Sequence, residues 1–447
     1  MLTIYSPSVS PRLQYIVTEL FCTMQGIEAE TTSDVLILTS RSMTSPCICY
    51  APTPIDKNAL WIKPCGLLSE TGIKNHELSV KKTADYFTLF SNTDSGSWPF
   101  DLFSAAFFML SRYEEQEGKT PDQHGRFKAE DSIAYQYGFL EEPIVDQWMQ
   151  KLLSAMKTRW PLMESSKRTF SYLKTIDVDN VFAYQHKGPL INGMHLIKDA
   201  TKGNWELVKQ RLRCILRLTT DPYFNLEEMS RIHQPYKEST IFFFHCGTVG
   251  SHDKKTWMPS LGYRKIRREL SKYFTIGLHP SYRSAHTPWM INIEKKILEN
   301  ITDQQIIRCR SHYLLFRIPT DYHKIEQLGF TDDYTMGYSN NPGFRAGTSI
   351  PYHLYYIDEE RPSKIMVHPL AVMDKSLHSN MHLTAEEAEQ YILKLANTIK
   401  SVNGELVTLF HNENQTDAEE FGWQGWKKMY ERLLKEITNA YPQENKG

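Results

Sequence analysis

The sequence contains few cysteines and no closely spaced cysteine motif. There are seven in 447 residues, an odd number, and none of them form a Cys-X-X-Cys pair. This composition argues against a disulfide framework and favours reduced thiols, so we expect a cytoplasmic location. Cys47 and Cys49 are the closest pair, and their spacing is more typical of one strand face than of a metal site.

The sequence also lacks an excess of charge of either sign and long apolar runs. Lys and Arg number 51 and Asp and Glu 52, which gives a formal net charge of -1. No global field would attract the chain to nucleic acid or to an anionic membrane, so we expect no nucleic-acid partner. The longest apolar runs, such as Phe103–Leu110 and Ile241–Phe244, are too short to cross a bilayer, so we expect no membrane span. Met1–Tyr5 is typical of a strand rather than of a secretory signal.

What the sequence does contain is enough apolar material for more than one domain, with 41% hydrophobic residues. We predict a smaller N-terminal α/β domain of unknown role over residues 1–160. Its expected elements include a strand at Leu2–Tyr5, a helix over Ser10–Gln25 and a strand at Asp34–Leu38. In residues 161–447 strands and helices alternate, which predicts a second α/β domain with parallel strands.

Three further segments carry local predictions. Asp122–Phe127 is dense in polar side chains, and we expect a structural turn in which Arg126 pairs with Asp122. Leu196–Arg217 has basic residues interleaved with apolar ones; such a helix can lie on a membrane, but we expect it to cover a sheet. Thr384 with Glu387 matches a capping box that begins a helix.

Two carboxylates follow the first strand of the second domain, within Lys174–Asn180. Alternate side chains of a strand share a face, so Asp177 and Asp179 point the same way. Two adjacent carboxylates repel, and a cation between them, or a division into base and metal ligand, removes the conflict. The alternative is an Asp pair that caps a turn.

Imidazoles and a guanidinium follow later strands. His279 ends the strand over Phe274–Leu278, because Pro280 cannot continue a ladder. His411 follows the strand over Glu405–Phe410. Ligands at the carboxyl ends of successive parallel strands are the pattern by which α/β barrels build active sites.

Three more polar residues follow strands in the same way. Arg310 and His312 have period-two spacing after the strand over Ile306–Cys309, which predicts that they share a strand face. His245 could reach the site or pack in the core beside Cys246. A carboxylate with two imidazoles suits zinc, iron, cobalt or nickel better than calcium or magnesium.

With these motifs in place, residues 165–440 resemble the NodB-homology polysaccharide deacetylases, carbohydrate esterase family four. Thr175-Ile176-Asp177-Val178-Asp179 is similar to the family's first motif, which implies that Asp177 is the catalytic base and Asp179 a metal ligand. His279-Pro280-Ser281 is similar to the second motif, whose leading histidine binds metal.

The remaining motifs of the resemblance concern the base and the acid. Arg310-Ser311-His312-Tyr313 stands where the family has Arg-Pro-Pro-Tyr, which implies that Arg310 orients the base. Leu409-Phe410-His411 is similar to the final motif, whose histidine is the catalytic acid. Asp122–Phe127 and a Gly343–Thr348 loop resemble features of a bacterial subgroup with two domains.

The chain departs from the family at the third metal ligand. The second motif usually has another histidine four residues on, where this chain has Arg283. We take His312 as the candidate third ligand, with His286 or water as alternatives. The family's Asp-rich fourth motif is not visible in the sequence.

The resemblance implies a distorted (β/α) barrel of the NodB-homology type in the second domain. It implies a divalent transition metal, zinc in the first place with cobalt, nickel or iron as alternatives. The implied reaction removes acetyl groups from an N- or O-acetylated sugar of a bacterial glycan, with an acetylated oligosaccharide or polysaccharide precursor as partner. A glycan-binding pseudoenzyme and a metal hydrolase of another amide remain as alternatives.

Overall fold

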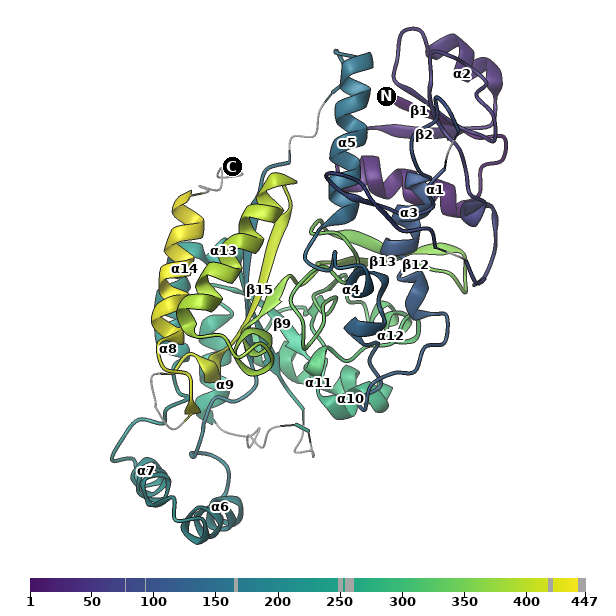
Figure 1. The fold of residues 1–447 in the computed structure, drawn as a ribbon. Helices are drawn as coiled ribbons and strands as arrows, with labels where there is room; N and C mark the ends of the chain where they lie inside the picture. The colour runs from purple at the N-terminus through teal and green to yellow at the C-terminus, as the bar shows by residue number, and fades with distance from the viewer. Residues whose placement is uncertain are drawn as a thin grey trace.

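The computed structural model describes residues 1–76, 78–92, 94–164, 168–247, 252–253, 261–416 and 421–440. Its strands form a four-stranded sheet, a nine-stranded sheet and a small two-stranded ribbon. The ribbon consists of β5 (Lys81–Lys82) and β6 (Phe87–Thr88). Figure 1 shows the smaller sheet and its helices above one end of the larger sheet.

The four-stranded sheet is parallel and has the order β2-β1-β3-β4. Its strands are β1 (Leu2–Tyr5), β2 (Ala29–Thr32), β3 (Cys47–Tyr50) and β4 (Leu60–Ile62). The predictions of a strand at Leu2–Tyr5 and of a strand carrying Cys47 and Cys49 are therefore confirmed. The predicted helix over Ser10–Gln25 is also confirmed, as α1 (Pro11–Val17) continued by a π-helical segment to Thr23.

The prediction of a strand at Asp34–Leu38 was wrong. The segment forms α2 (Val35–Arg41), and the Asp34 carboxylate caps it by accepting the N–H of Leu36 at 2.8 Å. A short apolar run fits a strand or a helix equally well by periodicity alone. Here the capping carboxylate satisfies a free N–H of the first turn and stabilises the helix.

Three further helices complete the N-terminal part. They are α3 (Leu102–Leu110), α4 (Ile133–Gln136) and α5 (Ile144–Arg159). Every residue of α3 is buried, because the helix lies between the small sheet and the rest of the molecule. Its first turn is capped by Asp101, which accepts the N–H of Ser104 at 3.0 Å.

The nine-stranded sheet has the order β12-β13-β11-β10-β9-β8-β7-β15-β14. All neighbouring strands are parallel except β12 and β13, whose antiparallel pairing the sequence did not predict. The strands are β7 (Ser171–Val178), β8 (Thr240–His245), β9 (Thr275–His279), β10 (Arg308–Cys309), β11 (Asp332–Asp333), β12 (Tyr352–Tyr356), β13 (Arg361–Val367), β14 (Val372–Met373) and β15 (Glu405–His411).

The helices of the second part alternate with strands from β8 to β11 and again between β14 and β15, as predicted, whereas β11 to β14 follow one another without an α-helix. They are α6 (Pro189–Thr201), α7 (Trp205–Ile215), α8 (Leu226–His233), α9 (Leu261–Leu270), α10 (Tyr282–His286), α11 (Pro288–Thr302), α12 (Thr320–Gln327), α13 (Ala385–Ser401) and α14 (Trp426–Ala440). The capping box of Thr384 and Glu387 is present at the start of α13. The mixed α/β class is confirmed. The described residues show no pairing between the outer strands β12 and β14, so a closed barrel stays a prediction.

The expectation that Leu196–Arg217 forms a helix covering a sheet was wrong. The segment belongs to two helices, α6 and α7, which meet at a turn where Gly203 has φ 73°. Figure 1 shows this hairpin apart from the layered body of the molecule. Amphipathic spacing identifies an apolar helix face, but it does not say what lies against that face.

The N-terminal part and the larger sheet share one continuous apolar core. Phe344 donates its N–H to the Leu140 carbonyl at 2.8 Å, and Ser349 donates its N–H to Asp146 at 2.8 Å. The Gly343–Thr348 loop therefore lies at the contact between the two parts. The division at residues 160 and 161 remains a prediction. No helix in the described part of the chain is both long and apolar enough to cross a bilayer.

Candidate metal and catalytic site

The predicted site residues lie at the carboxyl ends of five adjacent strands, in the order β10-β9-β8-β7-β15. In the sheet register, His411 stands beside Asp177 and His279 stands beside His245. Parallel strands bring their carboxyl ends to one edge, so residues far apart in sequence meet there. Asp177, Asp179, His279, Arg310, His312 and His411 are all buried at this edge.

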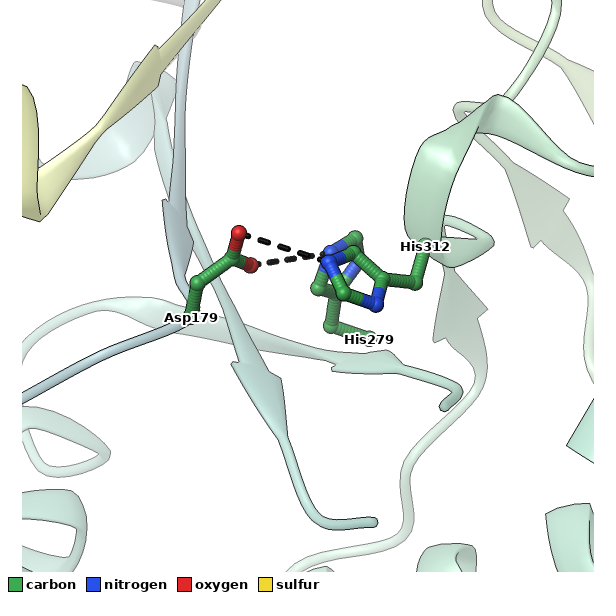
Figure 2. Close-up of side chains that lie close together, drawn as sticks. All are labelled: Asp179, His279 and His312. Atoms are coloured by element: carbon green, nitrogen blue, oxygen red, sulfur yellow. Dashed lines mark ion pairs between the residues drawn. The ribbon is translucent and has the colours of Figure 1, made fainter. Parts of the chain in front are cut away.

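Asp179, His279 and His312 form a close group of potential metal ligands. The Nε2 atom of His279 lies 3.1 Å from Oδ1 of Asp179, and Nε2 of His312 lies 3.5 Å from Oδ2. Figure 2 shows both imidazoles directed at the carboxylate. One carboxylate and two imidazole nitrogens are a donor set that zinc and its neighbours in the transition series prefer.

The orientation of His279 is set by its other ring nitrogen. Nδ1 lies 2.6 Å from the carbonyl oxygen of Arg310, and because a carbonyl only accepts, Nδ1 carries the proton. The lone pair of Nε2 then faces Asp179, and this buried atom has no hydrogen-bond partner among the described residues. Metal-ligating histidines take this arrangement, so the residues present fit a bound divalent metal.

The electrostatic environment of Asp179 and His312 favours a positive charge between the proposed ligands. Burial raises the pKa of Asp179, but the neighbouring His312 and His279 together lower it well below its ordinary value. Burial lowers the pKa of His312, but the anions Asp179 and Asp253 raise it to about 9. A carboxylate that stays ionised while buried is the state that a metal ligand requires.

His312 reaches this group by a different route from the one predicted. Strand β10 ends at Cys309, so Arg310 and His312 do not share a strand face, and that prediction was wrong. His312 begins a short 3₁₀ turn in which Tyr313 has φ 62° and Leu314 has φ 50°. Left-handed backbone is costly for side chains of this size and persists where the surroundings hold it.

The predicted pairing of Arg310 with Asp177 is present. Nη1 of Arg310 lies 3.0 Å from Oδ1 of Asp177. Arg310 is held on two other sides, because its Nε donates to the Tyr334 carbonyl at 3.0 Å and its guanidinium lies 4.5 Å from the ring centre of Phe243. The guanidinium of Arg310 therefore has a fixed position beside the Asp177 carboxyl group.

Asp374 is a partner of His411 that the sequence did not reveal. Its Oδ1 accepts from Nδ1 of His411 at 2.7 Å, and its Oδ2 accepts from the His411 N–H at 2.8 Å. Asn414 donates to the same carboxylate at 2.9 Å. Burial raises the pKa of Asp374, but His411 lowers it to a net value below the ordinary one.

A signal for Asp374 exists in the sequence but is weak. The residue directly follows β14, so it obeys the same strand-end rule as Asp179 and His279. Strand β14 has only two residues, too few for a periodic pattern to show. The residue after Asp374 is Lys375, whose Nζ lies 3.8 Å from Oδ2 of Asp179 and 3.5 Å from Oε1 of Glu413.

Asp253 is a second functional residue that sequence reasoning missed. Its Oδ1 lies 3.2 Å from Nδ1 of His312 and accepts the Tyr282 N–H at 2.7 Å. Asp253 thus fixes the His312 ring and ties it to the start of α10. His245, Asp253 and His312 are close enough to form an alternative ligand set.

The structure places His245 and His286, the two histidines whose roles the sequence left open. The ring centre of His245 lies 5.3 Å from that of His312, so this buried histidine belongs to the site region. Burial, His312 and His279 lower its pKa to about 3. His286 is absent from the ligand groups of the described residues and instead contacts the Tyr282 ring at 5.4 Å.

The turn over Asp122–Phe127 reaches the same edge from the N-terminal part. The predicted pairing of Asp122 and Arg126 is confirmed, with Oδ2 and Nη2 at 2.7 Å. Arg126 also donates to the Tyr313 carbonyl at 2.8 Å, and Nδ1 of His124 lies 3.2 Å from the Tyr282 hydroxyl. The turn therefore contacts Tyr313, which directly follows His312, and Tyr282, which begins α10 three residues after His279.

A family model matches the N-terminal part of the chain. Residues 2–161 match a family of unknown function (DUF7033). No curated protein matches the chain. A solved structure from Mycobacterium smegmatis, assigned as a polysaccharide deacetylase, aligns with 14% identity over 60% of this chain and 84% of its own, with a TM-score of 0.40.

A second solved structure is a mutant of a CE4 family pseudoenzyme with restored enzymatic activity. It aligns with 9% identity over 61% of this chain and 64% of its own, with a TM-score of 0.30. Both likenesses are distant. The roles of the residues in this site therefore follow from the chemistry of their own side chains.

Proposed function

We propose that this chain is a metal-dependent hydrolase that removes acetyl groups from an N- or O-acetylated sugar of a bacterial glycan. The observation that carries the proposal is the grouping of three potential ligands, Asp179, His279 and His312, beside the Asp177–Arg310 and His411–Asp374 pairs. A base, an acid and a metal site close together are the parts that metal-assisted amide or ester hydrolysis needs.

In this proposal Asp179, His279 and His312 hold the metal, zinc in the first place with cobalt, nickel or iron as alternatives. The chemistry that a bound metal supplies is polarisation of the acetyl carbonyl and acidification of a water molecule. Asp177 accepts the proton of the attacking water. Arg310, 3.0 Å from Asp177, orients that carboxylate.

His411 is the proposed acid. Its Nδ1 proton is held by Asp374 at 2.7 Å, so Nε2 is the nitrogen on the side of the proposed metal ligands, 4.0 Å from Oδ2 of Asp179. A protonated Nε2 would donate to the leaving amine or alcohol. Asp374 stabilises the positive charge on the ring during that transfer.

The remaining parts of the proposal concern the whole chain. We assign residues 161–447 to a distorted barrel of the NodB-homology type and residues 1–160 to an N-terminal domain. The partner would be an acetylated oligosaccharide or polysaccharide precursor, and the location cytoplasmic. The cysteines of the described residues are all free, which supports a reducing compartment.

A glycan-binding pseudoenzyme is the alternative, because Arg283 replaces the second histidine of the motif. Metal content separates the two functions. We expect the purified chain to carry about one equivalent of transition metal and to release acetate from acetylated oligosaccharides. A chelator should abolish acetate release, and zinc or cobalt should restore it. A metal-free chain that binds glycan without releasing acetate would establish the pseudoenzyme instead.

A further inference from the structure

We propose that the hairpin of α6 and α7 docks the protein on the surface of a membrane that contains anionic lipids. The hairpin is the segment that was expected to cover a sheet and instead lies apart from the layered body (Figure 1). The two helices pack on each other through a buried pair, with Arg211 Nη2 3.0 Å from Asp199 Oδ2. Their outer surfaces combine apolar and basic side chains.

The apolar side chains of α6 form an exposed stripe. Leu190, Met194 and Ile197 are 76%, 51% and 67% exposed. Residues at i, i+4 and i+7 lie on one helix face, so these three side chains form one strip along the helix. In most helices of folded proteins such a strip is buried against a core. Here solvent covers it.

Helix α7 repeats the arrangement. Trp205, Leu212 and Leu216 are 59%, 42% and 66% exposed, and their spacing again places them along one face. Eight of the exposed large hydrophobic residues of the described chain fall within residues 190–218. A cluster of exposed apolar side chains this dense in one segment marks a contact site rather than ordinary surface variation.

The charge of the hairpin favours an anionic partner. The exposed basic side chains of this segment are Lys198, Lys202, Lys209, Arg213 and Arg217, and its exposed acidic side chain is Glu206. The whole chain has a net charge of -1, so the excess of basic side chains on the hairpin is a property of this segment and not of the chain as a whole. Apolar stripes with tryptophan, flanked by lysine and arginine, are the composition of helices that lie in the lipid interface.

The position of the hairpin connects docking to the site. Helix α6 begins at Pro189, ten residues after Asp179, on the connection that leaves the carboxyl end of β7. Docking would therefore bring the strand ends toward the lipid surface. Docking does not depend on the proposed hydrolase activity, and its test does not require an activity measurement.

The test is sedimentation of the full-length protein with phosphatidylcholine vesicles, with and without phosphatidylglycerol. We expect binding to the mixed vesicles, weaker binding to phosphatidylcholine alone, and weakening by salt. Replacing Leu190, Met194, Trp205 and Leu212 together by Gln should reduce binding by about 100-fold or more. Replacing Lys198, Lys202 and Arg213 singly by Gln should cost about fivefold each on mixed vesicles.

The matched control replaces exposed apolar residues elsewhere, Leu36→Gln and Met43→Gln, which are 75% and 78% exposed in the N-terminal part. This variant should bind vesicles like the unmodified chain. All substituted side chains are exposed, so circular dichroism and thermal unfolding should not change. Absence of vesicle binding would overturn the proposal. So would sedimentation velocity showing a dimer that the hairpin variant dissociates, without vesicle binding, because a second copy would then cover the face.

Discussion

His279, His312 and His411 each use Nδ1 to fix the ring and direct Nε2 toward Asp179. Nδ1 is held by the Arg310 carbonyl in His279, by Asp253 in His312 and by Asp374 in His411. The Nε2 atoms then lie 3.1, 3.5 and 4.0 Å from the Asp179 carboxylate. The residues that hold these rings therefore decide which nitrogen is available for a metal or for a proton.

The assignment of His312 as third ligand is tested by removing its ring. In His312→Ala we expect the affinity for metal to fall by orders of magnitude, because one of the three proposed protein ligands is lost. The measurement is a competitive titration of zinc with a chelating dye. His286→Ala is the matched control and should bind zinc like the unmodified chain. Unchanged zinc affinity in His312→Ala would exclude His312 and leave His245, which lies beside it, or water as the third ligand.

Asp179→Ala and His279→Ala should each abolish stoichiometric metal binding. Asp179 lies within reach of both imidazoles, and Nε2 of His279 lies nearer to Asp179, at 3.1 Å, than to Asp177, at 3.7 Å. Metal analysis of the purified variants by mass spectrometry checks this expectation. Full occupancy in either variant would contradict the ligand assignment.

The base assignment predicts a variant that binds metal but does not turn over. Asp177→Asn keeps the shape of the side chain but cannot accept the proton of water. We expect kcat to fall by about 100- to 10,000-fold while metal content is retained. Thermal unfolding should be compared in parallel, because Arg310 loses an ionised partner at 3.0 Å. Near-normal kcat would move the base role to another residue.

Asp374→Asn tests the positioning of His411. The amide can still occupy the space, but it cannot hold the Nδ1 proton at 2.7 Å as a carboxylate does. We expect kcat to fall by about 100-fold with KM and metal content unchanged, because the ring acts after substrate is bound. A rise in KM with constant kcat would show that Asp374 acts on substrate binding instead.

At the scale of elements, the loop over Gly343–Thr348 shows why a glycine stands where two parts of the chain touch. Gly343 has φ 127°, and a Cβ atom there would lie 2.5 Å from the Leu140 carbonyl oxygen. Gly343→Ala should therefore lower the free energy of unfolding by about 2 kcal/mol or more. Urea unfolding of the variant measures this cost.

The control for that substitution is Gly138→Ala. Gly138 also has a left-handed backbone, with φ 76°, but a Cβ atom there meets nothing within 4 Å. Its expected cost is the backbone strain alone, about 1 kcal/mol. Equal costs in the two variants would mean that the loop relaxes away from Leu140.

At the scale of the whole molecule, a buried ionic group joins the N-terminal part to the larger sheet. Glu115 lies between two arginines, with Oε2 2.6 Å from Nη2 of Arg345 and Oε1 2.7 Å from Nε of Arg112. Burial raises the pKa of Glu115, but Arg345 and Arg112 lower it from 4.5 to about 2. Ionised Glu115 therefore stabilises the folded state.

This shift predicts a pH-dependent cost for Glu115→Gln. A lowered pKa contributes stability that is complete above 4.5 and is lost as the pH falls toward 2. Above that window we expect the variant to lose about 3 kcal/mol, because two buried arginines lose their shared anion. Denaturant unfolding at several pH values should show the difference from the unmodified chain narrowing in acid. A difference that is constant with pH would exclude a role for the ionised carboxylate.

The sequence by itself determined which strands end in polar chemistry. Apolar runs closed by a carboxylate or imidazole predicted the edge at which Asp177, Asp179, His279 and His411 meet, because parallel strands align their carboxyl ends. It also determined the capping box of α13 and the Asp122 turn, since both depend on side chains within a few residues of each other.

Only the tertiary structure decided which groups hold the site residues in place. Asp253 is 59 residues from His312 and Asp374 is 37 residues from His411, so no local spacing links them. The place of the α6–α7 hairpin was decided in the same way, since its amphipathic pattern is equally compatible with burial and with exposure. Periodicity reports on one segment at a time, whereas partners are set by contacts between segments that meet only in the folded chain.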